Sequence, residues 1–243
     1  MKTYCIGDLH GNYKGLIQAI DRSPFNPKED KLITLGDYID GGEHIEVLPI
    51  MEYLLELPNW EGVIGNHDFW MLETINEGWM YVEHIWYTQG GRQTLNSMGI
   101  GTSKEESMGI SRILNGDCPE VVKKFLRSLH LYYEQNNMVF VHAGWSSMSQ
   151  RIEESWSYKN KKADLYWVRD FWYSANKSEL PPYDKVFIGH TQDLDNPRKR
   201  GNVWNLDSGA GGIQGKVTVM DVDSEEFWQS DKTIELYPNA SFR

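Results

Sequence analysis

Short apolar runs that end in clusters of glycine and polar residues recur along the chain. Each run is made mainly of β-branched or aliphatic side chains and is bounded by Gly. This pattern is typical of β-strands that are buried on both faces. It predicts strands at Thr3–Ile6, Leu32–Leu35, Gly62–Ile64, Met138–Val141 and Val186–Ile188, and further strands near the end of the chain at Val203–Leu206 and Val217–Val222.

Helical spacing of apolar residues separates the early strands. Leu16, Ile17 and Ile20 recur with a helical period, as do the apolar positions between Val47 and Leu55. Strands that alternate with helices predict an α/β fold built from packed layers. In such folds the loops that follow the carboxyl ends of the strands carry the functional site, and the first five polar clusters all occupy that position.

The segment of about residues 69–133 departs from this alternation. It is rich in Trp, Tyr, Met and Glu, and it contains helix-like stretches such as Pro119–Ser128 without clear strand patterns. We expect a mostly helical insertion, or cap, on the α/β core. No linker or repeat interrupts the sequence, so residues 1–243 are expected to form one domain.

Composition narrows the classes of function. The 243 residues carry 24 Lys and Arg against 35 Asp and Glu, and this net charge of -11 argues against stable binding to nucleic acid, whose affinity comes mostly from basic side chains. Cys5 and Cys118 cannot build a disulfide framework and suit a reducing compartment. No apolar run reaches the roughly 20 residues that span a membrane, and no apolar signal region precedes the first charges. We therefore expect a cytoplasmic protein.

Metal-ligating residue types gather in the predicted strand-end loops. Four of the seven histidines lie there, with four aspartates and one asparagine. These residues are Asp8, His10, Asp37, Asp40, Asn66, His67, Asp68, His142 and His190. Oxygen ligands mixed with imidazoles, without thiolates, suit Mn, Fe or Zn. Asp37 lies between two other ligand-rich loops and is a candidate to bridge a pair of ions, which can activate a water and hold a phosphoryl group. His44, His84 and His130 lie elsewhere and are expected to be structural or surface residues.

The ordered clusters resemble the signature of the calcineurin-like metallophosphoesterase family. The matching motifs are Gly7-Asp8-Leu9-His10-Gly11, Gly36-Asp37-Tyr38-Ile39-Asp40, Gly65-Asn66-His67-Asp68, His142-Ala143-Gly144 and Gly189-His190-Thr191. Five motifs in the family's order make the resemblance specific. It is strongest to the phosphoprotein-phosphatase branch, in particular to small bacterial and bacteriophage serine/threonine phosphatases resembling lambda phosphatase. The resemblance implies a β-sandwich flanked by helices.

The resemblance also implies a role for each matching residue. Two divalent metal ions are expected, Mn in the first place and Fe or Zn as alternatives. Their ligands would be Asp8, His10 and Asp37 for one ion, and Asp37, Asn66, His142 and His190 for the other. His67, paired with Asp40, would act as general acid because a carboxylate favours the imidazolium that protonates a leaving alkoxide. The nucleophile would be a hydroxide or water that bridges the ions.

One position departs from the branch pattern. Its motif continues after the second Asp with Arg-Gly, whereas this chain has Gly41-Gly42, so one guanidinium clamp on the phosphate is missing. Arg169 matches a Trp-x-Arg segment of the family whose Arg contacts phosphate. Arg92, in a glycine-rich stretch, is a candidate to replace the lost Arg. We expect a lower affinity for phosphate than in relatives, or a preference for another phosphate ester.

The function predicted on this resemblance is phosphomonoester hydrolysis, with serine/threonine protein phosphatase as the main hypothesis. The alternatives are a symmetric bis(5'-nucleosyl)-tetraphosphatase, a nucleotide phosphodiesterase and a binding module without catalysis. The substrate would be a phosphoprotein or a small phosphate ester or nucleotide, in a bacterium or a phage-infected host cell. The aromatic residues Trp70, Trp79, Trp86 and Tyr87 either pack a cap against the core or stack a base.

Overall fold

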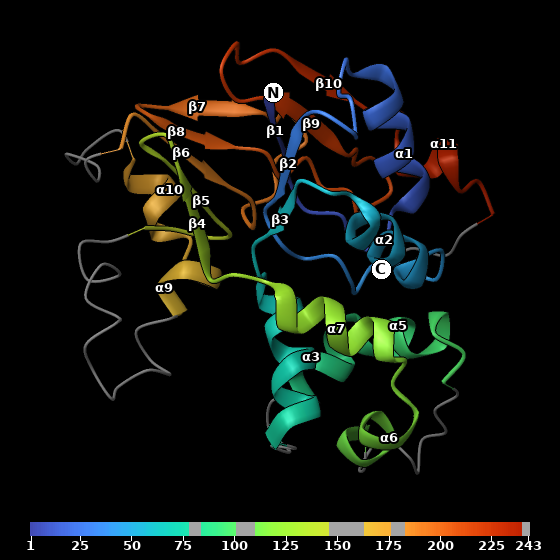
Figure 1. Cartoon of the computed structure of the whole chain (residues 1–243). Coiled ribbons are helices and arrows are strands. Elements are labelled where there is room, and N and C mark those ends of the chain that lie inside the picture. Colours follow the sequence, from blue (N-terminus) through green and yellow to red (C-terminus); the bar gives the residue numbers. More distant parts are fainter. Residues whose placement is uncertain (78–83, 101–109, 146–162, 176–182, 240–243) are drawn as a thin grey trace.

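The computed structural model describes residues 1–77, 84–100, 110–145, 163–175 and 183–239. Trp79 therefore lies outside the described residues. Two mixed β-sheets form the centre, and helices cover them (Figure 1). The predicted α/β sandwich flanked by helices is confirmed.

The first sheet has the strand order β10-β9-β1-β2-β3. Strands β1 (Thr3–Ile6), β2 (Lys31–Thr34) and β3 (Trp60–Gly62) are parallel, with Cys5 opposite Ile33 and Ile33 opposite Glu61. Strands β9 (Thr218–Asp221) and β10 (Phe227–Gln229) add an antiparallel edge. The carboxyl ends of β1, β2 and β3 therefore meet at one edge of the sheet.

The second sheet has the strand order β4-β5-β6-β8-β7. Its central strands β5 (Met138–Val141), β6 (Lys185–Ile188) and β8 (Val203–Asn205) are parallel. Strands β4 (Tyr132–Gln135) and β7 (Arg198–Arg200) pair antiparallel at the two edges. Each sheet thus has three adjacent parallel strands that direct their carboxyl ends to one edge.

Alternation of side chains along the strands builds the layers. In β5, Phe140 packs into the cluster between the sheets, while Val139 and Val141 pack on the outer face. In β1, Cys5 points to the shared cluster, while Tyr4 and Ile6 join the opposite core. Successive residues of a strand point to opposite faces, so a strand that is covered on both sides needs an unbroken apolar run. This requirement explains the runs in the sequence.

Helices cover both outer faces. The first sheet packs against α1 (Tyr13–Arg22). One apolar cluster joins this sheet and α1 to α2 (Val47–Glu56), α3 (Asn66–Glu77), α5 (Arg92–Ser97), α6 (Ile110–Asp117) and α7 (Glu120–Ser128), and within it α6 packs on α3. The second sheet packs against α9 (Ala163–Tyr166) and α10 (Asp170–Ser174). A π-helix, η1 (Tyr87–Gly91), precedes α5, and α11 (Thr233–Leu236) lies near the end of the chain.

The predicted elements agree with the structure except at their limits and at the sheet edges. The described part of 69–133 is helical up to α7, as predicted, but α3 already begins at Asn66 and β4 begins at Tyr132. The hydrophobic pattern does not identify β4, β7 or β10, which are short and partly exposed edge strands. Among the described helices, none is long and apolar enough to cross a membrane.

His44, in the loop before α2, is a buried histidine whose pKa makes stability depend on pH. Its ring is only 9% exposed and lies 4.7 Å from the ring of Tyr237, and burial lowers the pKa of His44 from 6.5 to about 4. The folded state therefore favours the neutral ring, and this stability is complete above about pH 6.5 and is lost as the pH falls toward 4.

We expect the free energy of unfolding of the wild type to fall by up to about 3 kcal/mol more than that of a His44→Gln variant between pH 6.5 and pH 4. Urea unfolding at a series of pH values measures this difference. Parallel pH profiles for the two proteins would contradict it.

Candidate metal centre

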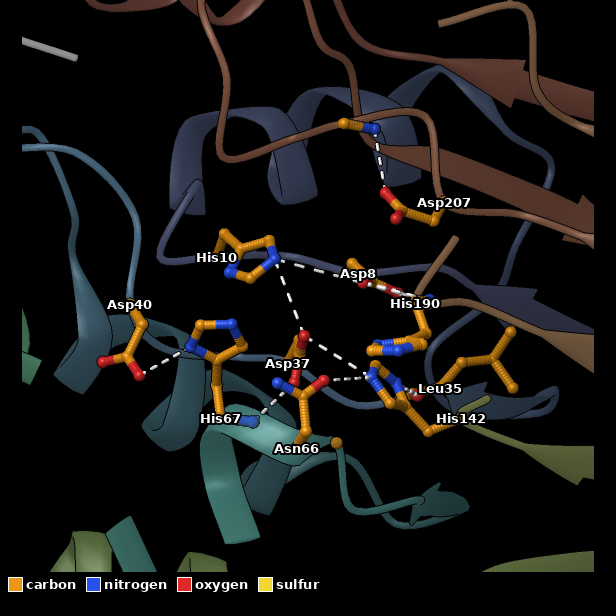
Figure 2. A network of polar contacts seen from close by, with 12 residues as sticks. Asp8, His10, Leu35, Asp37, Asp40, Asn66, His67, His142, His190 and Asp207 are labelled. Atoms are coloured by element: carbon orange, nitrogen blue, oxygen red, sulfur yellow. Dashed lines mark hydrogen bonds and ion pairs between the residues drawn. The ribbon is translucent and has the colours of Figure 1, made fainter. Parts of the chain in front are cut away.

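Polar side chains from six strand ends converge at the shared carboxyl edge of the two sheets (Figure 2). The first sheet contributes Asp8 and His10 after β1, Asp37 and Asp40 after β2, and Asn66 and His67 after β3. The second sheet contributes His142 after β5, His190 after β6 and Asp207 after β8. The structure thus brings together every predicted ligand, and it adds Asp207.

Asp37 lies at the centre of this group. Its Oδ2 is 3.4 Å from Nε2 of His142 and 3.7 Å from Nε2 of His10, and its Oδ1 accepts the backbone N–H of His67 at 3.0 Å. Two sets of three residues place their ligand atoms within 4.8 Å of one another. One is Asp37, His142 and His190; the other is His10, Asp37 and His67. Asp37 is common to both, as expected of a bridging ligand.

Backbone carbonyls orient the three predicted histidine ligands. Nδ1 of His10 donates to the carbonyl of Ile39 at 2.9 Å, and Nδ1 of His142 donates to that of Leu35 at 2.7 Å. In His190 it is Nε2 that donates, to the carbonyl of Trp167 at 2.7 Å. The second nitrogen of each ring is the one that a metal ion would use, and it becomes a ligand once it carries no proton. This arrangement is typical of metal-binding histidines, whose other nitrogen is held by a hydrogen bond.

The charges at this edge are those of a cation site. Burial, reinforced by the charge of Asp207, raises the pKa of Asp8 well above its usual value, and burial raises that of Asp207 to about 6. Burial acts in the same direction on Asp37, but His142 and His67 outweigh it and hold the pKa of Asp37 well below its usual value. Divalent cations would favour the ionised form of all three carboxylates. The donor set fits metal ions.

His142 and His190, which form a set with Asp37, have pKa values shifted in opposite directions. Burial favours the neutral ring in both, and the positive charge of His142 reinforces it to lower the pKa of His190 to about 3. For His142 the negative charges of Asp37 and Asp8 outweigh burial and raise the pKa to about 10. His142 therefore acts as counterion to the carboxylates, whereas His190 already has the neutral form that a metal ligand needs.

A separate pair, His67 and Asp40, lies beside this group. Nδ1 of His67 is 2.8 Å from Oδ2 of Asp40, whose side chain is fully buried. Oδ1 of Asp40 accepts from Nε1 of Trp86 at 3.2 Å and from the hydroxyl of Thr94 at 2.5 Å, and the same hydroxyl accepts the backbone N–H of Asp40 at 3.0 Å. Trp86 and Thr94 come from the helical segment, so this segment fixes the orientation of Asp40.

The π-helix η1 gives this segment its shape. Gly90 has a φ of 120°, and Gln89 has non-helical torsions. A Cβ on Gly91 would lie 2.7 Å from the indole of Trp86, so the glycine lets that ring pack against the turn. Single π-helical turns are often found at functional sites. Here the turn places the indole N–H of Trp86 within hydrogen-bonding distance of Asp40. It also places Gln89 among the residues that line a cavity next to His67.

Asp68 holds two of the site loops together. Its Oδ2 accepts the backbone N–H groups of Asp37 at 2.7 Å and of Gly65 at 2.9 Å, and its Oδ1 accepts that of Tyr38 at 3.1 Å. Burial and the charge of Asp37 nevertheless raise the pKa of Asp68 to about 7. The motif drew attention to Asp68, but only the structure assigns it this role of fixing the backbone around Asp37.

A cavity of about 220 Å³ lies beside the predicted metal ligands. Among its lining residues are His67, Trp70, Gln89, Trp167, Arg169 and Gln192. Arg169 also donates from Nη2 to the carbonyl of His190 at 3.3 Å. Arg92 is not a lining residue; its exposed side chain forms an ion pair with Glu43 at 3.0 Å. The structure thus brings Arg169 to the site and leaves Arg92 at the surface.

A second cavity of about 330 Å³ continues on another side of the site. It shares His10, Gln192 and Asp207 with the first cavity, and it is otherwise lined by Asp40 and three glycines of the loop after β8. Asp207 and this glycine loop follow an apolar run that ends in polar residues, which is the signal that identified the other site loops. Applied to Val203–Leu206, the same rule would have found Asp207.

The backbone at Gly41 has no room for the missing arginine. A Cβ at this position would lie 2.2 Å from the carbonyl oxygen of His10 and 2.5 Å from Cγ2 of Ile45. Real Cβ atoms do not approach backbone oxygen so closely, so any side chain would displace the loop that carries His10. A simple Gly41→Arg substitution would therefore alter the site instead of restoring a phosphate clamp.

Comparison with known proteins gives the same picture. The sequence model described as "Calcineurin-like phosphoesterase" matches residues 1–193. The chain is 29% identical over 147 residues to the symmetrical bis(5'-nucleosyl)-tetraphosphatase of Erwinia tasmaniensis, which covers 59% of this chain and 44% of that protein. It is 37% identical over 89 residues to serine/threonine-protein phosphatase 2 of Escherichia coli, which covers 36% of this chain and 38% of that protein. The alignments thus span less than half of each relative.

A solved structure shares the fold. The crystal structure of a candidate diadenosine tetraphosphatase superimposes with a TM-score of 0.61, covers 95% of this chain and 93% of its own, and is 16% identical in sequence. At this identity the likeness concerns the fold alone.

The contacts of Asp68 generate a prediction about the loops. In an Asp68→Asn variant an amide NH₂ would face at least one of the three backbone N–H groups, so we expect the free energy of unfolding to fall by about 1–3 kcal/mol. We also expect weaker binding of Mn²⁺, because the backbone of Asp37 loses its support. Urea unfolding and titration calorimetry measure the two effects. The matched control is Asp117→Asn at an exposed position; an equal effect of both variants would exclude this role for Asp68.

Proposed function

The chain belongs to the calcineurin-like phosphoesterase family, and we propose that it is a metal-dependent phosphomonoesterase that acts on phosphoserine and phosphothreonine in proteins. The observation that carries this proposal is the convergence of six strand ends on Asp37, with the His67–Asp40 pair and Arg169 at the same cavity. The similarity to a bacterial serine/threonine-protein phosphatase supports the choice of substrate.

We assign two metal ions to the group around Asp37. Asp8, His10 and Asp37 would hold one ion, and Asp37, Asn66, His142 and His190 would hold the other, with manganese as the proposed metal. When bound, such a pair activates water and neutralises charge on the phosphoryl group. The three ligand histidines reach this group with one ring nitrogen already held by a carbonyl, so the ligand set is preorganised.

His67 would deliver the proton to the leaving oxygen. Asp40 accepts a hydrogen bond from Nδ1 of His67, which leaves Nε2 to face the cavity and favours the protonated ring. His67 also belongs to one of the two potential ligand sets. We assign it to proton transfer because Asp8, 4.0 Å from His10, supplies an oxygen ligand for that set.

Arg169 would bind the phosphate oxygens. It is a basic residue that lines the cavity, and its hydrogen bond to the carbonyl of His190 holds it at the edge of the site. A guanidinium forms strong charge-assisted bonds to phosphate. With no side chain at position 41, Arg169 carries this role without the second arginine of the branch pattern.

A second candidate function is symmetric hydrolysis of a bis(5'-nucleosyl) tetraphosphate. The observation that favours it is the second cavity, because the two cavities meet at His10, Gln192 and Asp207 and together form an extended site. A substrate with phosphates on both sides of the scissile bond could occupy both. The tetraphosphatase relatives support this candidate as well.

The cytoplasm of a bacterium or of a phage-infected host is the proposed location. Cys5 and Cys118 are both free and buried. Burial raises the pKa of each thiol, to about 11 for Cys118, which disfavours the reactive thiolate. Unpaired cysteines of this kind suit a reducing compartment.

The decisive experiment measures hydrolysis of p-nitrophenyl phosphate, a phosphothreonine peptide and diadenosine tetraphosphate after removal of metal by a chelator and again after addition of Mn²⁺. We expect metal to restore hydrolysis of the two monoesters, with little cleavage of the tetraphosphate. Cleavage of the tetraphosphate alone would favour the second candidate function. Failure of the metal-loaded protein to cleave any of the three would refute both.

The His67→Asn variant is the control within this assay. We expect it to bind two equivalents of Mn²⁺ while the turnover of the phosphothreonine peptide falls by roughly 10²–10⁴-fold, the range usual for a general acid. A lower metal stoichiometry would instead identify His67 as a ligand.

Two arginine variants test phosphate binding. Arg169→Ala removes the guanidinium at the cavity, so we expect the KM for p-nitrophenyl phosphate to rise roughly 10-fold. Arg92→Ala removes an exposed ion pair and should change KM by less than about 2-fold. Steady-state kinetics with Mn²⁺ measures both. The opposite order of effects would show that Arg92 replaces the missing arginine.

A further inference from the structure

Two glutamines line the 220 Å³ cavity without belonging to the predicted metal ligands or to the His67–Asp40 pair. Gln192 also lines the second cavity, on the side of the glycine loop after β8. Gln89 lines the first cavity but not the second, and the same holds for His67 and Arg169. The amide of Gln89 therefore shares its cavity with the predicted proton donor and the predicted phosphate ligand.

An irregular turn of the backbone brings Gln89 to this cavity. The residue lies inside η1 with a φ of -96° and a ψ of 16°, and the next residue, Gly90, has a φ of 120°. Glycine adopts positive φ without steric cost, so Gly90 allows the helix to break at this point. Torsions close to those of Gln89 are sparsely populated and recur at active-site residues. The turn thus determines where the Gln89 side chain leaves the segment.

Both flanks of this turn are anchored to Asp40. Nε1 of Trp86 donates to Oδ1 of Asp40 at 3.2 Å, and the hydroxyl of Thr94 donates to the same oxygen at 2.5 Å. Both anchoring side chains are fully buried, and the other oxygen of Asp40 lies 2.8 Å from Nδ1 of His67. Gln89 lies between the two anchors in the sequence. Its backbone is therefore fixed relative to the predicted general acid, and a donor on it is positioned before a substrate binds.

The side chain of Gln89 is available to a ligand. The residue is exposed, and its amide has no hydrogen bond to any of the residues that the structure describes. A carboxamide carries two N–H donors. A phosphoryl group held at a pair of cations presents oxygen acceptors, so these donors match the ligand that the metal centre would bind.

Arg92 belongs to the same glycine-rich stretch but does not reach the cavity. Its guanidinium pairs with Glu43 at 3.0 Å, and its side chain is half exposed. The residue that this stretch contributes to the cavity is therefore Gln89.

We propose that Gln89 is a substrate-binding residue whose amide donates a hydrogen bond to a non-bridging phosphoryl oxygen, beside the guanidinium of Arg169. This inference rests on the proposed function. The amide takes the place of the arginine that is missing at position 41, and it does so from the segment that is anchored to Asp40. Hydrogen bonds to an ionised oxygen are stronger than those between neutral groups, and a neutral donor adds no charge that must be desolvated. One charged and one neutral side chain thus hold the phosphoryl group.

The test measures the binding of inorganic phosphate to the Mn²⁺-loaded protein by titration calorimetry, and kcat/KM for the phosphothreonine peptide. In Gln89→Ala we expect the dissociation constant of phosphate to rise roughly 5- to 20-fold and kcat/KM to fall at least as much. In Gln89→Glu both changes should be larger, because a carboxylate has no N–H and repels the phosphate. The matched control is Gln93→Ala, at a partly buried glutamine of α5 that lines neither cavity; it should change both values by less than about 2-fold.

Four results would overturn the proposal. The first is an unchanged phosphate affinity in both Gln89 variants. The second is an altered KM for the peptide with unchanged affinity for phosphate, which would place the amide against the leaving group. The third is an equal effect of Gln89→Ala and Gln93→Ala, which would identify a general disturbance of the segment. The fourth is a lower Mn²⁺ stoichiometry in Gln89→Ala, which would make the residue a support of the metal centre.

Failure of this assignment is distinguishable from failure of the proposed function. A wild type that hydrolyses the peptide, with Gln89 variants of unaltered phosphate affinity, refutes the role of Gln89 alone. A wild type that binds phosphate through Gln89 but hydrolyses no ester supports the role of Gln89 and refutes the proposed function. A metal-loaded wild type that neither binds phosphate nor hydrolyses an ester refutes both.

Discussion

The concentration of buried carboxylates at one edge of the sandwich is the constraint on which the rest of the structure depends. Asp8, Asp37, Asp68 and Asp207 are all nearly inaccessible to solvent and influence one another's pKa. Such a group cannot remain ionised in a protein interior without positive charge. The chain supplies part of it through His142, and the remaining deficit is what a pair of divalent cations neutralises. The folded structure therefore depends on positive charge at this edge, and metal binding supplies the part that His142 does not.

Much of this arrangement could be predicted from the sequence because buried parallel strands leave a clear pattern. A strand covered on both faces must be apolar throughout, and the polar residue after it must lie at the sheet edge. The apolar runs therefore located β1, β2, β5 and β6 within a residue, and with them the loops of the metal centre. The order of the motifs indicated the family, and the resemblance to that family implied a role for each matching residue.

The remainder could not be predicted because it depends on contacts between distant segments. Nothing local indicates that Thr94 and Trp86 hold Asp40, which lies 54 and 46 positions away. The charge of Arg92 suggested a phosphate ligand, but only the fold shows that Glu43 lies beside it. The edge strand β7 consists of Arg198, Lys199 and Arg200, and its stability comes from pairing with β8, which a hydrophobic pattern does not record.

The packing at Gly41 also constrains how this sequence could have changed. Ile45 lies within 2.6 Å of the positions that a Cβ would occupy at both Gly11 and Gly41, so the three residues form one interlocked unit. Position 41 can accept a side chain only if Ile45 is replaced by a smaller residue and the His10 loop moves. A single substitution at position 41 is therefore deleterious whatever it adds to phosphate binding. Packing alone therefore restricts position 41 to glycine, and another loop could supply a phosphate-binding cation at lower cost to the fold.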